Sequence, residues 1–263
     1  MTEYKTWIKD LFDSVSLEYG KRESFKYFGE ALVHYAVLSQ GEHVLDVATG
    51  RGAIAFPASE MVGPTGRVAA IDISEKMIDE AKKEKAHDWL EFYEMDAEAL
   101  TFDDEAFDVV FCGFGLPFLP HVDKALAQMK RVLKPGGCLA LSIVAKRPAL
   151  DLWVAQRAKA LGARQKLYPF ALENQQALQD LLEKAGFVEI EMAEETKTFK
   201  HEDANSWWQN LLSYEIRGLY EQLSPENQEL LKQEALAKVS GEPSLLSQEQ
   251  KVIYAAAEKP ELI

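Results

Sequence analysis

The sequence predicts an α/β fold: a doubly wound, mostly parallel, seven-stranded sheet with helices on both faces. Three observations carry this prediction. Short apolar runs alternate with segments of helical periodicity from residue 43 onward, which is the pattern of repeated strand–helix–strand units. The run at 107–114 is almost wholly apolar, as expected of a strand covered on both faces. A turn containing Gly50 and Gly52 separates the first apolar run from the helix that follows it.

The individual elements follow from local signals. Two helical patterns occupy the N-terminal part and end before Gly41. The expected strands are 43–48, 67–72, 89–95, 107–114, 138–145, 187–192 and 252–259. Ser74 caps the helix after the second strand, and Pro135-Gly136-Gly137 ends the helix before the fifth. Residues 202–240 are again helical, with an apolar stripe from Trp207 to Leu223 on one helix.

The composition argues against several classes of protein. Hydrophobic residues make up 47% and charged residues 27% of the 263 positions, which are ordinary values for a globular chain. The net charge of −14 opposes nucleic-acid binding, since phosphates require a basic surface. Cys112 and Cys138 lie in apolar strands, so we expect buried free thiols rather than a disulfide or a metal site.

No segment has the features of a membrane span or a signal peptide. The apolar runs fall short of the ~18 residues that a membrane helix needs. Residues 1–12 lack the apolar core of a signal peptide. The sequence therefore predicts a cytoplasmic protein.

Three acidic residues end successive predicted strands. Asp46, Asp72 and Asp96 should meet at the carboxyl edge of the sheet, where open α/β sheets bind ligands. Asp46, beside the glycine turn, suits a cationic amino group, Asp72 suits two ribose hydroxyls, and Asp96 suits the amino group of an adenine. Three carboxylates would repel one another without a ligand or donors to satisfy them. The pattern therefore indicates a binding site.

These residues belong to a series of motifs: LDVATGRG, AAIDIS, EMDAEAL, FDVVFCGFGLPFLP and RVLKPGG, in that order. The series resembles class I S-adenosylmethionine (SAM)-dependent methyltransferases, and more narrowly the small-molecule branch related to ubiquinone/menaquinone-biosynthesis C-methyltransferases. The resemblance covers residues 40–145, and FDSVSLEYG at 12–20 is also similar to that branch. It implies a Rossmann-like fold, SAM as the cofactor and S-adenosylhomocysteine (SAH) as the product.

The resemblance also implies a set of cofactor-binding residues. They are Asp46, Ala48, Gly50, Gly52, Asp72, Ile73, Met77, Asp96, Ala97, Gly113 and Tyr19. The first motif would hold the methionine part of SAM, the second-strand acid the ribose, and the Asp-Ala pair the adenine. Ala48 departs from the glycine of many members. Tyr19 would reach the cofactor carboxylate, with simple packing as its alternative.

The resemblance organises the chain as a single domain over residues 1–263. Helices at 1–40 would cover the cofactor, and residues 41–200 and 250–263 would form the core. The insertion at 202–240 would be a subdomain. The family carries one antiparallel strand at the sheet edge, which here would be 252–259.

Two other functions fit parts of the pattern. Gly50-x-Gly52-x-x-Ala55 with Asp72 beyond it is close to the dinucleotide fingerprint, which makes an NAD(P)-dependent oxidoreductase the main alternative. Asp46 would face a pyrophosphate unfavourably, and Asp96 has no standard role there. A non-catalytic SAM-binding protein is the third reading, and the intact acids count against it. The predicted activity is methyl transfer from SAM to an O, N or C atom of a small molecule.

The acceptor side carries weaker signals. Displacement at a sulfonium depends mainly on proximity and water exclusion, so no catalytic residue is assigned. His121 would be either a general base or an exposed loop histidine. Phe118, Trp207 and Trp208 are expected to wall the acceptor pocket, with the insertion as its lid. A homodimer interface would use the same aromatic surface.

Overall fold

The computed structural model describes residues 2–20, 22–164 and 174–261. The predicted domain at 1–263 also includes residues 1, 21, 165–173 and 262–263, which lie outside the described residues. Within the described ranges, one seven-stranded sheet has the order β3-β2-β1-β4-β5-β7-β6. Its strands are β1 (His43–Val47), β2 (Arg67–Asp72), β3 (Leu90–Glu94), β4 (Phe107–Gly113), β5 (Leu133–Lys146), β6 (Val188–Lys200) and β7 (Ser247–Glu258). The predicted α/β fold with a mostly parallel sheet is confirmed.

The position of the last strand differs from the expectation. β7 is antiparallel to both β5 and β6, so it lies inside the sheet and β6 forms the edge. The burial of the two strands explains this order. β7 carries the buried run 252–255, which requires cover on both sides, whereas β6 alternates partly buried and exposed residues along most of its length. The antiparallel strand was predicted correctly, but its place at the edge was wrong.

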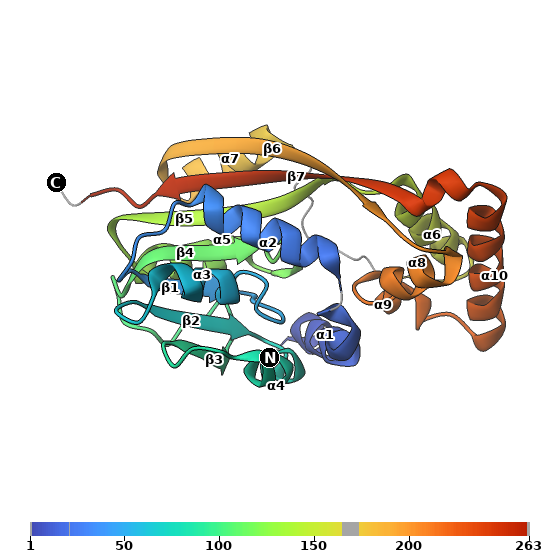
Figure 1. Ribbon diagram of the computed structural model, residues 1–263, viewed down its shortest axis with the longest axis horizontal. Coiled ribbons are helices and arrows are strands. Elements are labelled where there is room, and N and C mark those ends of the chain that lie inside the picture. The colour runs from blue at the N-terminus through green and yellow to red at the C-terminus, as the bar shows by residue number, and fades with distance from the viewer. Residues whose placement is uncertain (1, 21, 165–173, 262–263) are drawn as a thin grey trace.

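Helices cover both faces of the sheet (Figure 1). They are α1 (Glu3–Tyr19), α2 (Glu23–Tyr35), α3 (Ala55–Val62), α4 (Glu75–Glu84), α5 (Val122–Val132), α6 (Ala149–Ala160), α7 (Gln175–Lys184), α8 (Ala204–Leu211), α9 (Ile216–Tyr220) and α10 (Pro225–Gly241), with short 3₁₀ helices η1 (Leu116–Phe118) and η2 (Pro243–Leu246). One core cluster joins α5 and α7 to the sheet, and a second joins α2, α3 and α4 to it. Cys112 is buried as predicted, whereas Cys138 is only partly buried.

A helical lobe stands at one end of the sheet, where the long strands β6 and β7 lead (Figure 1). It contains α6, α8, α9 and α10, which share a third hydrophobic cluster. Two features differ from the sequence prediction. The stripe from Trp207 to Leu223 falls on two helices, α8 and α9, rather than one. The lobe also includes α6, which lies well before residue 202, and the stripe packs against α6 and α10 instead of the sheet.

The N-terminal helix α1 is tied to the ends of the parallel strands. Asp13 accepts a hydrogen bond from the Ser74 hydroxyl at 2.5 Å, at the start of α4. Arg51, in the glycine turn, donates to the carbonyls of Ser16 and Leu17 near the end of α1. These contacts hold α1 across the carboxyl edge of the sheet. Among the described helices, none has the length and hydropathy needed to cross a membrane.

Candidate active site

Asp46 ends β1 as a fully buried carboxylate with an unused acceptor. Its Oδ2 atom accepts a hydrogen bond from the Thr49 hydroxyl at 2.5 Å. Its Oδ1 atom is buried and has no hydrogen-bond partner among the described residues. Burial raises the pKa of Asp46 to about 7, and the nearby charge of Asp72 adds to the rise. A buried carboxylate in this state would gain free energy from a cationic donor.

The turn after β1 has the backbone shape that glycine favours. Ala48, Gly50 and Gly52 have φ angles of 57°, 55° and 83°. A Cβ atom on Gly52 would lie 2.7 Å from the Phe56 ring, so a side chain does not fit there. The φ angle of Ala48 also lies in the left-handed region, which is unfavourable for a residue with a Cβ atom. The departure from glycine at position 48 thus places strain beside the site.

Asp72 ends β2 and holds the glycine turn. Its two carboxylate oxygens accept hydrogen bonds from the backbone N–H groups of Gly50, at 2.8 Å, and Ser74, at 2.9 Å. Burial raises the pKa of Asp72 to about 6, and these backbone donors oppose the rise. Each carboxylate oxygen has a second lone pair. Asp72 can therefore accept additional donors, such as ribose hydroxyls, from the cavity that it lines.

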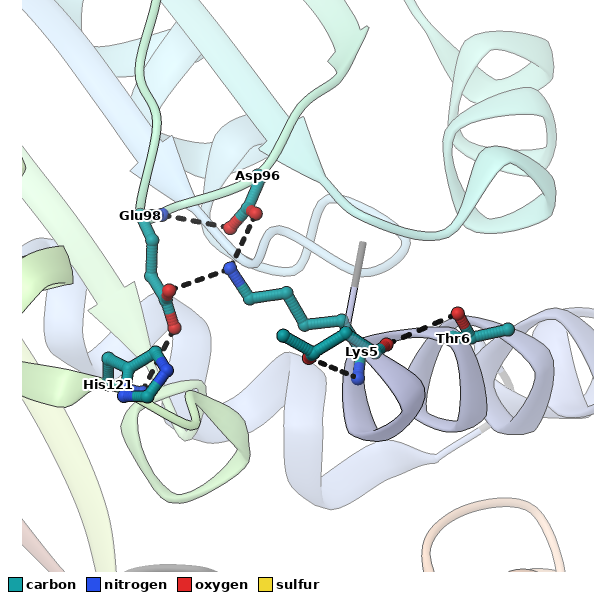
Figure 2. A network of polar contacts seen from close by, with 6 residues as sticks. Lys5, Thr6, Asp96, Glu98 and His121 are labelled. Atoms are coloured by element: carbon teal, nitrogen blue, oxygen red, sulfur yellow. Dashed lines mark hydrogen bonds and ion pairs between the residues drawn. The ribbon is translucent and has the colours of Figure 1, made fainter.

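Asp96 lies just beyond β3 in a network with the first helix (Figure 2). The Lys5 ammonium lies 2.6 Å from an Asp96 oxygen and 2.7 Å from a Glu98 oxygen. The other Asp96 oxygen accepts the Glu98 backbone N–H at 2.9 Å, and Glu98 accepts the His121 backbone N–H at 3.0 Å. The acid expected at the adenine end is therefore already paired with a cation from α1.

Two cavities adjoin these strand ends. The smaller, of about 70 Å³, lies between α1 and the carboxyl ends of β1, β2 and β4. The larger, of about 550 Å³, lies between the N-terminal helices, the β5 end and the helical lobe. Four aromatic residues line both: Phe12, Tyr19, Phe114 and Phe118. The rings of Phe12 and Phe118 meet edge to face at 5.0 Å. An aromatic wall therefore separates the two cavities.

The smaller cavity brings together most of the expected cofactor residues. Its walls include Tyr19, Ala48, Gly50, Asp72, Ile73, Asp96, Ala97 and Gly113. Three others lie behind the wall. Asp46 and Met77 are fully buried, and Gly52 packs against Phe56. Met77 lies in the first turn of α4, where its backbone N–H bonds to Ser74.

The residues expected at the acceptor pocket divide differently. Phe118 lines both cavities. Trp207 and Trp208 line neither: they are 1% and 2% exposed and lie in the core of the lobe. Their predicted place in the pocket wall is therefore corrected, because α6, α9 and α10 enclose α8 and accommodate both rings. From the same segment, the larger cavity is lined by Asn210, Tyr214 and Glu215.

Several wall residues escaped the sequence prediction. Lys5, Phe12 and Arg22 come from the N-terminal segment, and His201 follows β6. Phe12 and Tyr19 are seven residues apart, which places them on one face of α1 and was the available signal. His121, weighed as a base, belongs to neither cavity wall. The described residues contain no cluster of His, Cys, Asp or Glu suited to a metal ion.

Comparison with known proteins agrees with this geometry. The profile of the ubiE/COQ5 methyltransferase family matches residues 1–200. A demethylmenaquinone methyltransferase of Lactococcus lactis is 32% identical over 212 residues, covering 70% of this chain and 83% of that protein. An aklanonic acid methyltransferase of a Streptomyces species is 38% identical over 146 residues, covering 54% of this chain and 66% of that protein.

Solved structures share the fold. A candidate methyltransferase from Bacillus halodurans has a TM-score of 0.61 at 25% identity, covering 88% of this chain and 97% of that one. A Haemonchus contortus phosphoethanolamine N-methyltransferase, solved with SAH, has a TM-score of 0.55 at 22% identity, covering 89% of this chain and 53% of that one.

The fold, the acids at the strand ends and the comparisons together show that this protein is a SAM-dependent methyltransferase of small molecules. The oxidoreductase and the non-catalytic readings are set aside, and SAM is the cofactor. More narrowly, the chain belongs to the ubiE/COQ5 methyltransferase family.

Proposed function

We propose that this methyltransferase holds SAM along the smaller cavity and methylates an aromatic acceptor in the larger one. The observation that carries the proposal is the aromatic wall shared by the two cavities, formed by Phe12, Tyr19, Phe114 and Phe118. An acceptor in the larger cavity would then lie next to the methyl group of a cofactor held against this wall.

The residues present fit SAM. The unpartnered Oδ1 atom of Asp46 matches a cationic amino group, and Asp72 offers acceptors for ribose hydroxyls. Gly50 lines the cavity and has no side chain, so a ligand can approach its backbone closely. Asp96 and Ala97 lie at the adenine end of the same wall. When bound, SAM supplies a methyl group on a positively charged sulfur that is already a good leaving group.

The protein's own contribution is positioning and exclusion of water. Phe12 and Phe118 contact each other edge to face between the cavities, so they would shield the transfer path from solvent. Among the ionisable groups of the larger cavity, burial lowers the pKa of His201, which leaves its imidazole neutral near pH 7. His201 is therefore one side chain of the larger cavity that could accept a proton from an acceptor that must lose one.

The lining of the larger cavity favours a flat acceptor. In addition to the four shared rings, Phe25, Phe199 and Tyr214 line it. Aromatic walls of this kind bind rings by stacking and edge contacts. One relative is named for ubiquinone and menaquinone biosynthesis, and another for the methylation of aklanonic acid. These names support an aromatic acceptor for this chain as well.

The smaller cavity is narrow because α1 lies over it. About 70 Å³ is well below the volume of sites that enclose ligands of SAM's size, roughly 300 Å³ and above. Lys5, Phe12 and Tyr19 form the cover. We propose that α1 moves outward for SAM to enter and then closes over it, while α2 stays packed against the sheet. A cytoplasmic location and a homodimer stay predictions of the sequence.

Transfer of label from methyl-labelled SAM tests the acceptor class. The assay would compare naphthols and a naphthohydroquinone with aliphatic amines. We expect label only in the aromatic compounds. Label in the amines alone would contradict the proposal.

A variant pair locates the acceptor. Phe25→Leu removes a ring that lines only the larger cavity, and Phe102→Leu removes a ring outside both cavities. Since one aromatic contact contributes about 0.5–1.5 kcal/mol, we expect the KM for the aromatic acceptor to rise about threefold or more in Phe25→Leu. The KM in Phe102→Leu and the SAH affinity of both variants should stay unchanged. An equal KM in the two variants would place the acceptor elsewhere.

A further inference from the structure

The larger cavity contains a buried arginine whose hydrogen-bond donors are only partly used. Arg22 precedes α2, is 8% exposed and lines the cavity wall. None of the ion pairs formed by residues 2–20, 22–164 and 174–261 includes it. Its Nη1 atom donates to neutral groups, the Asn210 carbonyl at 2.5 Å and the Ser213 hydroxyl at 3.4 Å. Its Nε atom is buried and has no partner among the described residues.

Two aromatic rings fix the orientation of this guanidinium. The Cζ atom of Arg22 lies 4.0 Å from the centre of the Tyr214 ring and 4.8 Å from that of Phe25. A ring offers no hydrogen-bond acceptor comparable to a carboxylate, so these contacts leave N–H donors of the guanidinium available, and its Nε atom has no partner among the described residues. A planar anion such as a carboxylate matches these donors.

The start of α2 reinforces the positive potential at the same place. Arg22 is the N-cap residue, and no side chain caps the helix. The first-turn residues Glu23, Ser24 and Phe25 line the larger cavity beside the guanidinium. The Phe25 N–H already donates to the Arg22 carbonyl at 3.2 Å, and the helix dipole favours an anion at this end of α2.

The carboxylates in the cavity wall have donors of their own. Asp151 accepts from the Gln248 amide at 3.1 Å and from the Tyr214 hydroxyl at 3.5 Å. Glu215 is ion-paired with Arg147. Glu23 also lines the cavity, but its side chain is exposed to solvent and forms no ion pair with Arg22. The charge of Arg22 opposes the rise that burial causes in the pKa of Asp151, so these two groups interact across the cavity wall without a direct ion pair. The Nε donor of Arg22 stays unsatisfied among the described residues, and a buried donor without a partner is costly.

We propose that Arg22 and the N-terminus of α2 form a subsite for a carboxylate carried by the aromatic acceptor. The acceptor class is then an aromatic carboxylic acid, with its ring between the aromatic walls and its carboxylate on the guanidinium edge. This inference rests on the proposed function, since it places the acceptor in the larger cavity. Arg22 acts as a binding residue and takes no part in the transfer of the methyl group.

Calorimetry with two matched probes tests the subsite. Naphthalene-2-carboxylate and naphthalene-2-carboxamide share a ring and differ in charge, and each would be titrated into the SAH-loaded protein. A charged hydrogen-bond pair distinguishes them, so we expect the carboxylate to bind about tenfold more tightly or better. Equal affinities, or no measurable binding of the carboxylate at millimolar concentration, would overturn the proposal.

Three variants assign the preference to Arg22. Arg22→Met should bind the two probes within about twofold of each other, whereas Arg22→Lys should keep part of the preference because it keeps the charge. Arg157→Met removes an arginine that is paired with Glu234 on the lobe and should keep the full preference. A preference that survives in folded Arg22→Met would contradict the proposal. If Arg22→Met does not fold, an undiminished preference in Arg22→Lys contradicts it equally.

The same experiment separates this inference from the proposed function. If SAH binds but the carboxylate preference is absent, only the Arg22 subsite fails. If SAH does not bind, the proposed function fails, and the titration of the two probes into the ligand-free protein still decides the subsite.

Discussion

The ammonium of Lys5 lies 2.6 Å from a carboxylate oxygen of Asp96, although the two residues are 91 positions apart in the sequence. Lys5 comes from the first turns of α1, and Asp96 lies beyond the end of β3, in the wall of the smaller cavity. Glu98 holds the same ammonium at 2.7 Å (Figure 2). This pairing holds α1 over the strand ends. Asp96 therefore both fixes α1 and lines the smaller cavity that α1 covers.

Replacing Lys5 should therefore loosen the cover. In Lys5→Met, two partly buried carboxylates lose their cation, which we expect to cost about 1–2 kcal/mol of local stability. Hydrogen exchange of residues 3–12 should accelerate about tenfold as a result. Lys9→Met is the matched control. Lys9 is also on α1, but it pairs with the more exposed Glu94 at the end of β3. Similar exchange in the two variants would show that the Lys5 pairing does not fasten α1.

Asp46 and Asp72 should make cofactor binding depend on pH. Burial raises their pKa values to about 7 and about 6. A cationic amino group and hydroxyl donors favour the ionised carboxylates, so SAH binding should release protons. We expect the Kd of SAH to rise as pH falls, by about tenfold per pH unit for each proton taken up. Asp46→Asn should remove the change in the SAH Kd that occurs near pH 7. An unchanged dependence of the Kd on pH in this variant would contradict the role of Asp46 in binding the cofactor.

Asp46 and Asp72 should also make the stability of the ligand-free protein depend on pH, with a trend opposite to that of cofactor binding. A carboxyl group whose pKa is higher in the folded than in the unfolded chain binds protons preferentially in the folded state. Stability should therefore increase as pH falls from about 8 to about 5, toward the unfolded value near 4. Thermal unfolding of the wild type and Asp46→Asn would measure this, with the exposed Asp104→Asn as control. A larger gain in Asp46→Asn than in the wild type would show that the sign is wrong.

Trp208 should stabilise the lobe and leave the cofactor site unaffected. It is 2% exposed and contacts Trp207 and Tyr220 in the lobe core. Trp208→Ala should lower the free energy of unfolding by about 3–5 kcal/mol, and Trp208→Phe by less. Leu230→Ala, on an exposed position of α10, should change it by less than about 0.5 kcal/mol. If Trp208→Phe binds the acceptor more weakly but keeps its thermal stability, Trp208 contributes to the acceptor pocket, and a purely structural role for this residue is wrong.

The strand ends and the glycine turn were predictable from the sequence because their signals are local. A short apolar run that ends in Asp and meets a glycine has few alternative structures, and the positive φ angles at Gly50 and Gly52 agree with it. The three acids lie at one edge of the sheet for the same reason: the carboxyl ends of parallel strands share an edge. The acids that follow successive strands in the sequence are therefore close together at this edge.

The acceptor side could not be predicted in the same way, because it depends on contacts between distant segments. Arg22 bonds to Asn210, 188 positions away, and nothing local marks either residue. The adjacent Trp207 and Trp208 cannot share a direction on a helix, and the sequence could not show that α6 and α10 would enclose both. Likewise, the place of β7 inside the sheet depends on β6 pairing with it.

Titration of SAH into the wild type and Asp72→Asn tests the central claim, that the strand-end acids hold the cofactor. Asparagine keeps the side-chain shape but loses the charge that accepts ribose hydroxyls, worth about 1.5–3 kcal/mol. We predict that SAH binds the wild type, that NAD does not, and that Asp72→Asn binds SAH at least about tenfold more weakly while remaining folded. An unchanged SAH Kd in folded Asp72→Asn, or binding of NAD without SAH, would contradict the claim.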